Sequence, residues 1–348
     1  MASPDPAPQS ASEQTRRKLP SKPRVIVTRH LMPAVEERMS ELFDTVLNPD
    51  DTPMDEAALV AAMADCDVLV PTVTDRITAA MFERAGERLG LIANFGAGTE
   101  HIDLAAAAER RIIVTNTPGV FTDDTADIAM AMILGVPRRI REGTQLVRRG
   151  EWTGWAPSGL LGRKIGGKVL GIIGMGRIGQ AVAHRARAFG LEVIYHNRKR
   201  LPEALEGMLG ARFEGDLDAL VAKADILTLH CPLTEDTRAL MDARRIGLMK
   251  PGSSIINTAR GELIETDALI EALASGHLVG AGLDVYPDEP HVDRRLIDHP
   301  NVMTLPHIGS ATREGREASG EKVIANIRFW ADGHRPPDQV LTALVGKA

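Results

Sequence analysis

Residues 168–198 read KVLGIIGMGRIGQAVAHRARAFGLEVIYHNR, and this stretch holds the pattern that decides the fold. The apolar run that begins at Val169 is typical of a strand buried on both faces. A glycine-rich turn follows, and apolar residues then recur at helical spacing until Gly190 ends the helix. Leu191–Tyr195 is a second apolar strand. The stretch therefore predicts a strand, a tight turn, a helix and a second strand within about thirty residues.

Three glycines of the turn have separate tasks in binding a dinucleotide. Gly174 permits the sharp turn, Gly176 lets a pyrophosphate approach the backbone, and Gly179 lets the helix pack close to the strand. The N-terminus of the helix offers unpaired N–H groups and a positive dipole end to the phosphates. The glycine spacing alone is a weak signal, since a purely structural turn can share it. Its position between a strand and a helix favours dinucleotide binding.

The end of the second strand indicates which dinucleotide binds. NAD-binding proteins usually place Asp or Glu about 20 residues past the first glycine, against the ribose 2′-hydroxyl. This chain has Asn197 there, followed by Arg198, Lys199 and Arg200. These cations can pair with a 2′-phosphate, although a solvated basic turn has the same sequence pattern. We therefore expect NADP(H) to be preferred and NAD(H) to remain usable.

Length and composition limit the classes of protein. The chain has 348 residues, enough for about two domains, and a net charge of −6, which leaves no global basic surface for nucleic acid. No apolar run approaches the ~20 residues of a membrane span, so no membrane partner is expected. The two cysteines, Cys66 and Cys231, suit buried reduced thiols in the cytoplasm. They indicate neither a disulfide framework nor a metal site.

Strands and helices alternate along the chain, which predicts an α/β protein with two parallel sheets. Residues 1–22 are rich in Pro, Ser and Ala and are expected to be a disordered tail rather than a secretory signal. Residues 23–121 lack the glycine fingerprint and should form a flavodoxin-like substrate (catalytic) domain. Residues 122–305 should form the dinucleotide-binding Rossmann domain with its doubly wound parallel sheet. Residues 306–335 end in a helix that is expected to return to the first domain, which is then discontinuous.

One long helix is expected at the start of the second domain. Asp123 or Asp124 caps it, and it should run to about Arg149. The connector that follows holds Trp152 and Trp155, two of the three tryptophans in the chain. Aromatic side chains outside a core suggest a subunit interface, with a role in domain packing as the alternative.

Ligands of open α/β sheets bind at the carboxyl ends of the strands, so the residues after each strand are candidates for chemistry. Arg260 follows the expected strand Ser253–Asn257. Its planar guanidinium can hold a substrate carboxylate in a bidentate fork, or it can form a surface salt bridge.

His307 follows the last expected strand and suits the donation of a proton to an alkoxide near neutral pH. His30, His230 and His299 are rivals of His307 on spacing alone. Glu289 can orient the imidazole and favour its protonated form, or it is simply one acid of an Asp-Glu-Pro turn.

Five motifs stand in order along the chain, namely GMGRIG, HCPLT, NTARG, LDVYPDEP and PHIGSAT. Together they resemble the D-isomer-specific 2-hydroxyacid dehydrogenase family, most of all its glyoxylate and hydroxypyruvate reductases. The resemblance implies that Arg260 holds the substrate and that His307 is the acid/base catalyst with Glu289 as its partner. It also implies that the backbone N–H groups of Ala97 and Gly98 bind the substrate carboxylate.

The resemblance further implies cofactor contacts beyond the three glycines. The positions that match cofactor-binding residues of the family are Thr125, Arg177, Ile178, Asn197, Arg198, Pro232, Thr237, Thr258, Asp284 and Gly309. Family members are dimers through the long helix and the connector after it, so a homodimer is expected. Asn197 departs from the Asp common in the family, and residues 99–103, TEHID, vary the usual loop sequence.

The implied activity is the NAD(P)H-dependent reduction of small 2-oxo acids, such as glyoxylate and hydroxypyruvate, by hydride transfer. Formate dehydrogenases and phosphite-oxidising enzymes share the fold, but the former carry Gln where this chain has Glu289. A dinucleotide-sensing protein of the corepressor kind is a further alternative, because such proteins can retain the catalytic residues. Residues 71–74, PTVT, are small or β-branched and favour a short or hydroxylated substrate over an aromatic one.

Overall fold

The computed structural model of the chain describes residues 22–341 and divides them into two compact units. Unit 1 takes residues 22–117 and 320–341, and unit 2 is Pro118–Ser319. The expected tail over residues 1–22 lies outside the described residues but for its last one. The expected return to the first domain at residue 306 comes too early, because Ile308 and Gly309 donate hydrogen bonds to Asp284 of unit 2.

Unit 1 is built on a five-stranded parallel sheet with the order β2-β1-β3-β4-β5. The strands are β1 (Arg24–Val27), β2 (Asp44–Val46), β3 (Val68–Val70), β4 (Leu91–Ala93) and β5 (Ile113–Thr115). The helices are α1 (Pro33–Leu42), α2 (Glu56–Asp65), α3 (Ala79–Arg84), α4 (Leu104–Glu109) and the later part of α13 (Arg313–Ala331). This strand order is that of flavodoxin-like sheets, as expected.

Both faces of this sheet are apolar because successive residues of a strand point to opposite sides. Ile26 and Leu69 lie in the core formed with α2, α3 and α4. Val25 and Val68 lie in the core formed with α1 and α13, which contributes Trp330. The sheet is therefore a middle layer between two layers of helices.

Unit 2 is built on a seven-stranded parallel sheet with the order β12-β11-β10-β9-β6-β7-β8. The strands are β6 (Val169–Ile173), β7 (Glu192–His196), β8 (Ala211–Phe213), β9 (Ile226–Leu229), β10 (Ser253–Asn257), β11 (Leu278–Leu283) and β12 (Val302–Thr304). The order reverses between β6 and β9, as in a Rossmann-type doubly wound sheet. Ligands of such sheets bind at the carboxyl ends of the strands beside this reversal.

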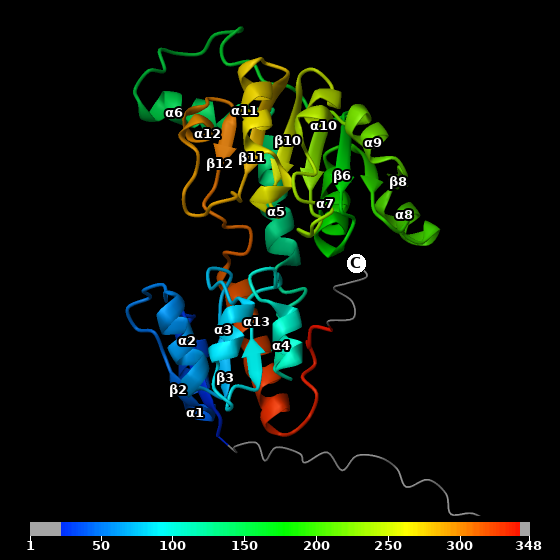
Figure 1. Cartoon of the computed structure of the whole chain (residues 1–348). Coiled ribbons are helices and arrows are strands. Elements are labelled where there is room, and N and C mark those ends of the chain that lie inside the picture. The colour runs from blue at the N-terminus through cyan, green and yellow to red at the C-terminus, as the bar shows by residue number, and fades with distance from the viewer. Residues whose placement is uncertain (1–21, 342–348) are drawn as a thin grey trace, which may run out of the picture. The chain divides into compact units, whose positions relative to one another are not determined.

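Helices cover both faces of this second sheet (Figure 1). The helices of unit 2 are α5 (Thr122–Gly135), α6 (Ile140–Arg148), α7 (Arg177–Ala188), α8 (Glu203–Leu209), α9 (Leu217–Lys223), α10 (Ala243–Leu248), the 3₁₀ helix η1 (Gly261–Leu263), α11 (Thr266–Ala274), α12 (Arg294–Asp298) and the start of α13. One apolar core joins the sheet to α5, α7 and α8, and the other joins it to α9, α10, α11 and α12.

The long helix that was expected to reach residue 149 is broken into α5 and α6. Pro137 lies between them and has no N–H to donate to a helix, and Arg139 has a left-handed backbone with φ 56°. The residue before α5 is Phe121, so neither Asp123 nor Asp124 is the cap. Their carboxylates lie in the first turn instead, where they favour the positive end of the helix dipole.

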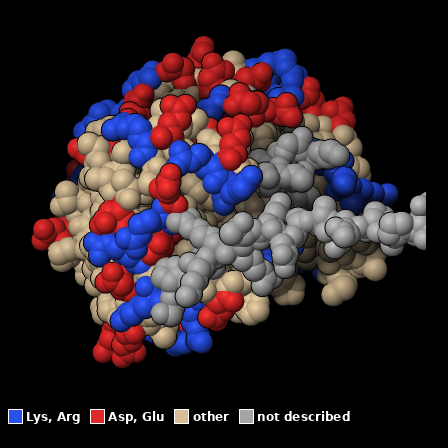
Figure 2. Space-filling view, turned by 60° about the horizontal axis from the view of Figure 1, so that its bottom comes forward, with Lys and Arg blue, Asp and Glu red and all other residues tan. Residues whose placement is uncertain are grey.

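The surface carries charges of both signs, and the two cysteines form no disulfide with each other. On the face shown in Figure 2, basic and acidic side chains are interspersed. No helix within residues 22–341 has both the length and the apolarity to cross a membrane. Cys66 and Cys231 are free, and burial raises the pKa of their thiols to about 12 and about 11.

Candidate active site

The three fingerprint glycines form the turn from β6 into α7. Gly174 has φ 97°, and a Cβ there would lie 2.4 Å from the backbone nitrogen of Cys231. A Cβ on Gly179 would lie 2.2 Å from the carbonyl oxygen of Gly174, so the helix and the strand pack as the motif requires. A Cβ on Gly176 would meet no atom within 4 Å, so the backbone is open there.

Helix α7 begins at this opening and supplies donors to it. The N–H groups of Arg177 and Ile178, both expected cofactor contacts, belong to the first turn, where an α-helix has no internal acceptor. Neither donates a hydrogen bond to another residue of the described part of the chain. Free N–H groups, the positive dipole end and the open backbone at Gly176 together fit a pyrophosphate.

The end of β7 is tied to the glycine turn by Asn197. Its Oδ1 accepts a hydrogen bond of 2.8 Å from the N–H of Met175, and its Nδ2 has no partner among residues 22–341. Arg198 and Lys199 are exposed and form no ion pair with another described residue. An amide donor and two cations without an ion-pair partner in the described chain therefore stand at the end of β7.

Arg200 is engaged elsewhere, which corrects the expectation that all three cations of the turn can serve a phosphate. Its Nε and Nη2 donate to the two carboxylate oxygens of Glu206 at 2.9 and 2.7 Å. The hydroxyl of Tyr195 donates to the same carboxylate at 2.6 Å. The bonds from Arg200 and Tyr195 lower the pKa of Glu206 to about 2. Arg200 therefore braces α8 against β7.

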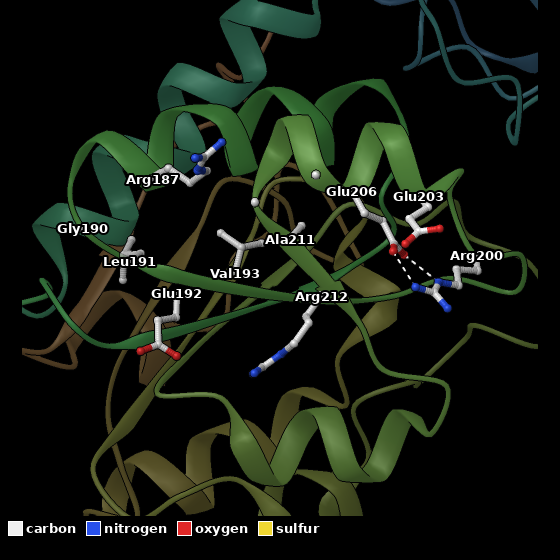
Figure 3. A pocket seen from close by; sticks show the side chains of 12 residues that line it. Arg187, Gly190, Leu191, Glu192, Val193, Arg200, Glu203, Glu206, Ala211 and Arg212 are labelled. Carbon is white, nitrogen blue, oxygen red and sulfur yellow. Dashed lines mark hydrogen bonds and ion pairs between the residues drawn. The ribbon is translucent and has the colours of Figure 1, made fainter.

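A hollow of about 600 Å³ lies beside this ion pair (Figure 3). Its charged lining balances Arg187, Arg200 and Arg212 against Glu192, Glu203 and Glu206. Arg187 also donates a hydrogen bond of 2.6 Å to the carbonyl oxygen of Met208. None of the expected catalytic residues lines the hollow, so it is not the candidate active site.

His307 and Glu289 lie in direct contact, as expected. His307 follows β12 and Glu289 follows β11, and Nδ1 of the imidazole lies 2.7 Å from Oε2 of the carboxylate. The other carboxylate oxygen accepts from the N–H of Tyr286 at 2.9 Å. Burial opposes the ionisation of Glu289, but the hydrogen bond and charge of His307, together with the N–H of Tyr286 and the charge of Arg260, outweigh it, so the pKa of Glu289 lies below its usual value. The imidazole is thereby oriented through Nδ1, which leaves Nε2 to face a ligand.

Asp284, at the end of β11, holds the backbone around His307. Its carboxylate oxygens accept from the N–H groups of Ile308 at 2.8 Å and Gly309 at 2.7 Å. His307 has φ 54°, a left-handed conformation that few residues other than glycine adopt. Burial raises the pKa of Asp284 above its usual value, against the effect of these two hydrogen bonds. Sequence reasoning gave Asp284 a cofactor role only and missed this second one, although a carboxylate at a buried strand end was the available signal.

The loop after β10 presents Arg260. Asn257, the last residue of β10, donates from Nδ2 to the carbonyl oxygen of Arg260 at 2.8 Å. Its Oδ1 accepts from the N–H of Ala259 at 3.0 Å. Because Asn257 is buried, the backbone under Arg260 is fixed to the sheet.

The loop that carries Arg260 lies against the loop that carries Glu289. A Cβ on Gly261 would lie 2.1 Å from the carbonyl carbon of Tyr286, so the two loops are in backbone contact. The positive charge of Arg260 is one of the causes of the low pKa of Glu289. The carboxyl ends of β10, β11 and β12 thus bring Arg260, Glu289 and His307 together.

Other expected cofactor positions gather along the same sheet edge. Thr125 on α5 donates from its hydroxyl to the carbonyl oxygen of Gly309 at 3.1 Å. Thr237 donates to the carbonyl oxygen of Pro232 at 2.8 Å. The hydroxyl of Thr258, at the end of β10, is buried and has no partner among residues 22–341. An orphaned buried hydroxyl at this edge fits a bound cofactor.

The rival histidines have different surroundings. Burial lowers the pKa of His230 to about 4, so this imidazole is neutral near pH 7. Burial and the charge of Arg141 lower the pKa of His299. His30 lies in unit 1, where its Nδ1 is 2.7 Å from the carbonyl oxygen of Leu31. Of the three candidate histidines in unit 2, His307 alone has a carboxylate within ion-pair distance in the described part of the chain, whereas His30 lies 3.2 Å from Glu36 in unit 1.

Ala97 and Gly98 lie in the loop after β4, at the carboxyl edge of the sheet of unit 1. Ala97 is exposed, and the N–H groups of both residues donate to no other residue of the described chain. Residues 22–341 contain no group of three or more His, Cys, Asp or Glu side chains that could hold a metal ion.

Comparisons with known proteins agree with this geometry. A family model described as D-isomer specific 2-hydroxyacid dehydrogenase, NAD binding domain, matches residues 130–309. A glyoxylate reductase from Thermococcus litoralis is 42% identical over 323 residues, which cover 92% of this chain and 97% of that protein.

Two solved structures share the architecture over nearly the whole chain. A glyoxylate reductase from Paecilomyes thermophila has a TM-score of 0.82 and 33% identity, with 92% of this chain and 99% of that chain covered. An NADPH-dependent glyoxylate/hydroxypyruvate reductase from Sinorhizobium meliloti, in complex with NADP and malonate, has a TM-score of 0.81 and 32% identity, with 92% and 97% covered.

Proposed function

This chain belongs to the D-isomer-specific 2-hydroxyacid dehydrogenase family, and from that premise we propose that it is an NAD(P)H-dependent reductase of small 2-oxo acids, glyoxylate and hydroxypyruvate among them. Relatives that carry those activities in their names support the substrate class. The observation that carries the proposal is the 2.7 Å contact between Nδ1 of His307 and Glu289, with Arg260 on the adjoining loop.

The chain's own residues supply the proton and the charge for the reaction. A bound nicotinamide cofactor supplies the hydride that reduces the carbonyl carbon of the substrate. His307 gives the proton from Nε2 to the carbonyl oxygen, because Nδ1 is held by Glu289. Arg260 neutralises the carboxylate of the 2-oxo acid and polarises its carbonyl group. The backbone N–H groups of Ala97 and Gly98 bind the substrate carboxylate.

Unit 2 is the proposed cofactor domain and unit 1 the proposed substrate domain. The cofactor contacts are Thr125, Gly174, Gly176, Arg177, Ile178, Gly179, Asn197, Arg198, Pro232, Thr237, Thr258, Asp284 and Gly309. NADP(H) is the preferred cofactor, since Asn197 and Arg198 face a 2′-phosphate without a competing carboxylate in the turn, and NAD(H) remains usable. The NADPH-dependent relative from Sinorhizobium meliloti supports this preference.

The decrease in NADPH absorbance at 340 nm tests the activity directly. We expect turnover with glyoxylate and hydroxypyruvate, and slower turnover with phenylpyruvate, because the small or β-branched residues 71–74 favour a short or hydroxylated substrate over an aromatic one. A protein that binds NADPH but is inert toward a panel of 2-oxo acids would instead be a dinucleotide sensor. Formate oxidation with NADP⁺ or NAD⁺ would indicate a formate dehydrogenase-like enzyme.

A homodimer is the proposed assembly and the cytoplasm the proposed location. Apolar side chains are exposed on α6 and the connector after it, namely Ile140, Val147, Trp152, Trp155 and Leu161. Trp155 is 83% exposed, and a second copy would cover such side chains. A monomer in light scattering at micromolar concentration would contradict the dimer. The two free cysteines suit a reducing compartment.

A further inference from the structure

The loop after β4 has three consecutive carbonyl oxygens that are held by asparagine side chains. Asn94 donates from Nδ2 to the carbonyl oxygens of Gly96 at 3.1 Å and Gly98 at 2.8 Å. Asn116 donates from Nδ2 to the carbonyl oxygen of Ala97 at 2.7 Å. Asn94 directly follows β4 and Asn116 directly follows β5, so two neighbouring strands hold one loop.

Because the peptide bond is planar, the hydrogen bonds to these carbonyl oxygens also fix the direction of the N–H groups. In a trans peptide, the C=O of one residue and the N–H of the next point in opposite directions. The carbonyl of Gly96 shares a peptide with the N–H of Ala97, and the carbonyl of Ala97 shares one with the N–H of Gly98. Because both carbonyls are turned to the asparagines, both N–H groups point away from them. Neither N–H donates to another residue between 22 and 341.

Only a side-chain amide can make all the hydrogen bonds that Asn94 makes. It is 0% exposed, and its Oδ1 lies 3.0 Å from Nε2 of His101. A primary amide offers two N–H donors and one acceptor oxygen, whereas a carboxylate can only accept. The two carbonyl partners therefore require the amide, and Asp cannot replace it.

We propose that Asn94 and Asn116 are positioning residues that aim the N–H groups of Ala97 and Gly98 at the substrate carboxylate. Two adjacent outward N–H groups form a concave donor site that suits an anion. The proposal rests on the proposed function, which makes this anion the carboxylate of a 2-oxo acid. The two asparagines act through the peptide planes of the loop and touch no substrate.

Asn116→Ala is the decisive variant, because Asn116 is half-buried and its loss leaves the core intact. One misaimed N–H group should raise KM for glyoxylate by about tenfold, since a hydrogen bond to a charged group is worth about one order of magnitude in affinity. KM for NADPH should stay unchanged. The Kd of oxalate, which carries a carboxylate and cannot be reduced in this way, should rise by the same factor in calorimetry with NADPH present.

Asn48→Ala is the matched control in the same unit. Asn48 also donates from Nδ2 to two backbone carbonyls, those of Thr28 and Thr52, each at 2.8 Å. Its loss should lower the melting temperature and leave KM for glyoxylate and the Kd of oxalate unchanged. Asn94→Ala is the less decisive variant, because the carbonyl oxygen of Gly96 also accepts from the N–H of Thr117 at 2.9 Å.

Unchanged KM and Kd in Asn116→Ala, or an equal rise in Asn48→Ala, would overturn the proposal. A wild-type protein that binds oxalate but reduces no 2-oxo acid would contradict the proposed function instead. In that case the Kd of oxalate in the two variants still decides whether the asparagines aim the loop.

Discussion

The two units differ in the groups that we propose to face a ligand at the carboxyl edges of their sheets. In unit 2, these groups are the side chains of Arg260, Glu289 and His307, which stand after three adjacent strands. In unit 1, they are the backbone N–H groups of Ala97 and Gly98, with asparagine side chains behind them. A reacting side chain must be one of a few residue types, whereas a backbone donor can belong to any residue. Where the backbone is the donor, the residue type is instead restricted at the neighbouring side chains that hold the peptide planes.

The largest expected effect is that of His307→Ala, which removes the proposed proton donor from the side-chain site of unit 2. General acid catalysis is worth roughly 10²–10⁴ in rate, so kcat should fall by about that factor. The Kd of NADPH, measured by fluorescence titration, should not change. His230→Ala is the control, because His230 is neutral near pH 7 and has no imidazolium proton to give. A silent His307→Ala together with an inactive His230→Ala would reverse the assignment.

Asp284→Asn tests whether unit 2 also depends on held backbone. An amide cannot accept from both Ile308 and Gly309 without turning its NH₂ group toward one of them, so the left-handed turn at His307 should relax. A displaced imidazole should lower kcat by roughly 10- to 100-fold. Steady-state kinetics on a variant with an unchanged circular dichroism spectrum make the test. Wild-type kcat would show that Asp284 does not position His307.

Arg198→Ala tests whether a side chain of unit 2 also binds the 2′-phosphate of the cofactor. Loss of one charge-assisted contact to the 2′-phosphate should weaken NADPH by about tenfold and leave NADH nearly unchanged, with a smaller gap at high salt. Arg200→Ala is the matched control, since Arg200 is bound to Glu206. Asn197→Asp should move the preference toward NADH. An equal loss of both cofactors in Arg198→Ala would assign this side chain to the solvated surface.

The smallest expected effect is that of replacing His230, and it concerns the pH dependence of the free energy of unfolding rather than the reaction rate. Its pKa is about 4 in the fold and about 6.5 in the unfolded chain, so between these values only the unfolded chain binds the proton. The free energy of unfolding therefore falls as the pH is lowered through this window. His230→Gln should lose about 2 kcal/mol less than wild type between about pH 7 and pH 5 in urea titrations. Equal losses would show that His230 takes up a proton in the folded state.

Much of the fold was predictable from the sequence because most of its strands are buried apolar runs. Strand β10 has its expected bounds, and the two parallel sheets were expected as well. The short strands β2 and β8 and the helices α8 and α12 were missed, since brief elements with exposed residues carry little periodicity. The break between α5 and α6 was also missed, although Pro137 marked it.

The candidate site was predictable where a residue type implies chemistry. Residue type and position after a strand made Arg260, Glu289 and His307 candidates, but their roles were expected only from the resemblance of the five motifs, since His30, His230 and His299 were rivals on spacing alone. Asn94 and Asn116 were missed because an amide at a strand end is common and its role depends on which carbonyls it reaches. The commitment of Arg200 was missed for a similar reason, since its partner Glu206 lies on the unexpected helix α8.

The central claim is that Glu289 holds His307 as the proton donor. The most direct test is kcat/KM for glyoxylate against pH in wild type and in Glu289→Gln. Because the pKa of Glu289 is lowered, its carboxylate stays ionised through the whole neutral range and can hold Nδ1 of the imidazole. Glutamine keeps the size of the side chain and removes the charge. The variant should therefore have a lower kcat/KM than wild type throughout the neutral range, and coincident profiles would contradict the claim.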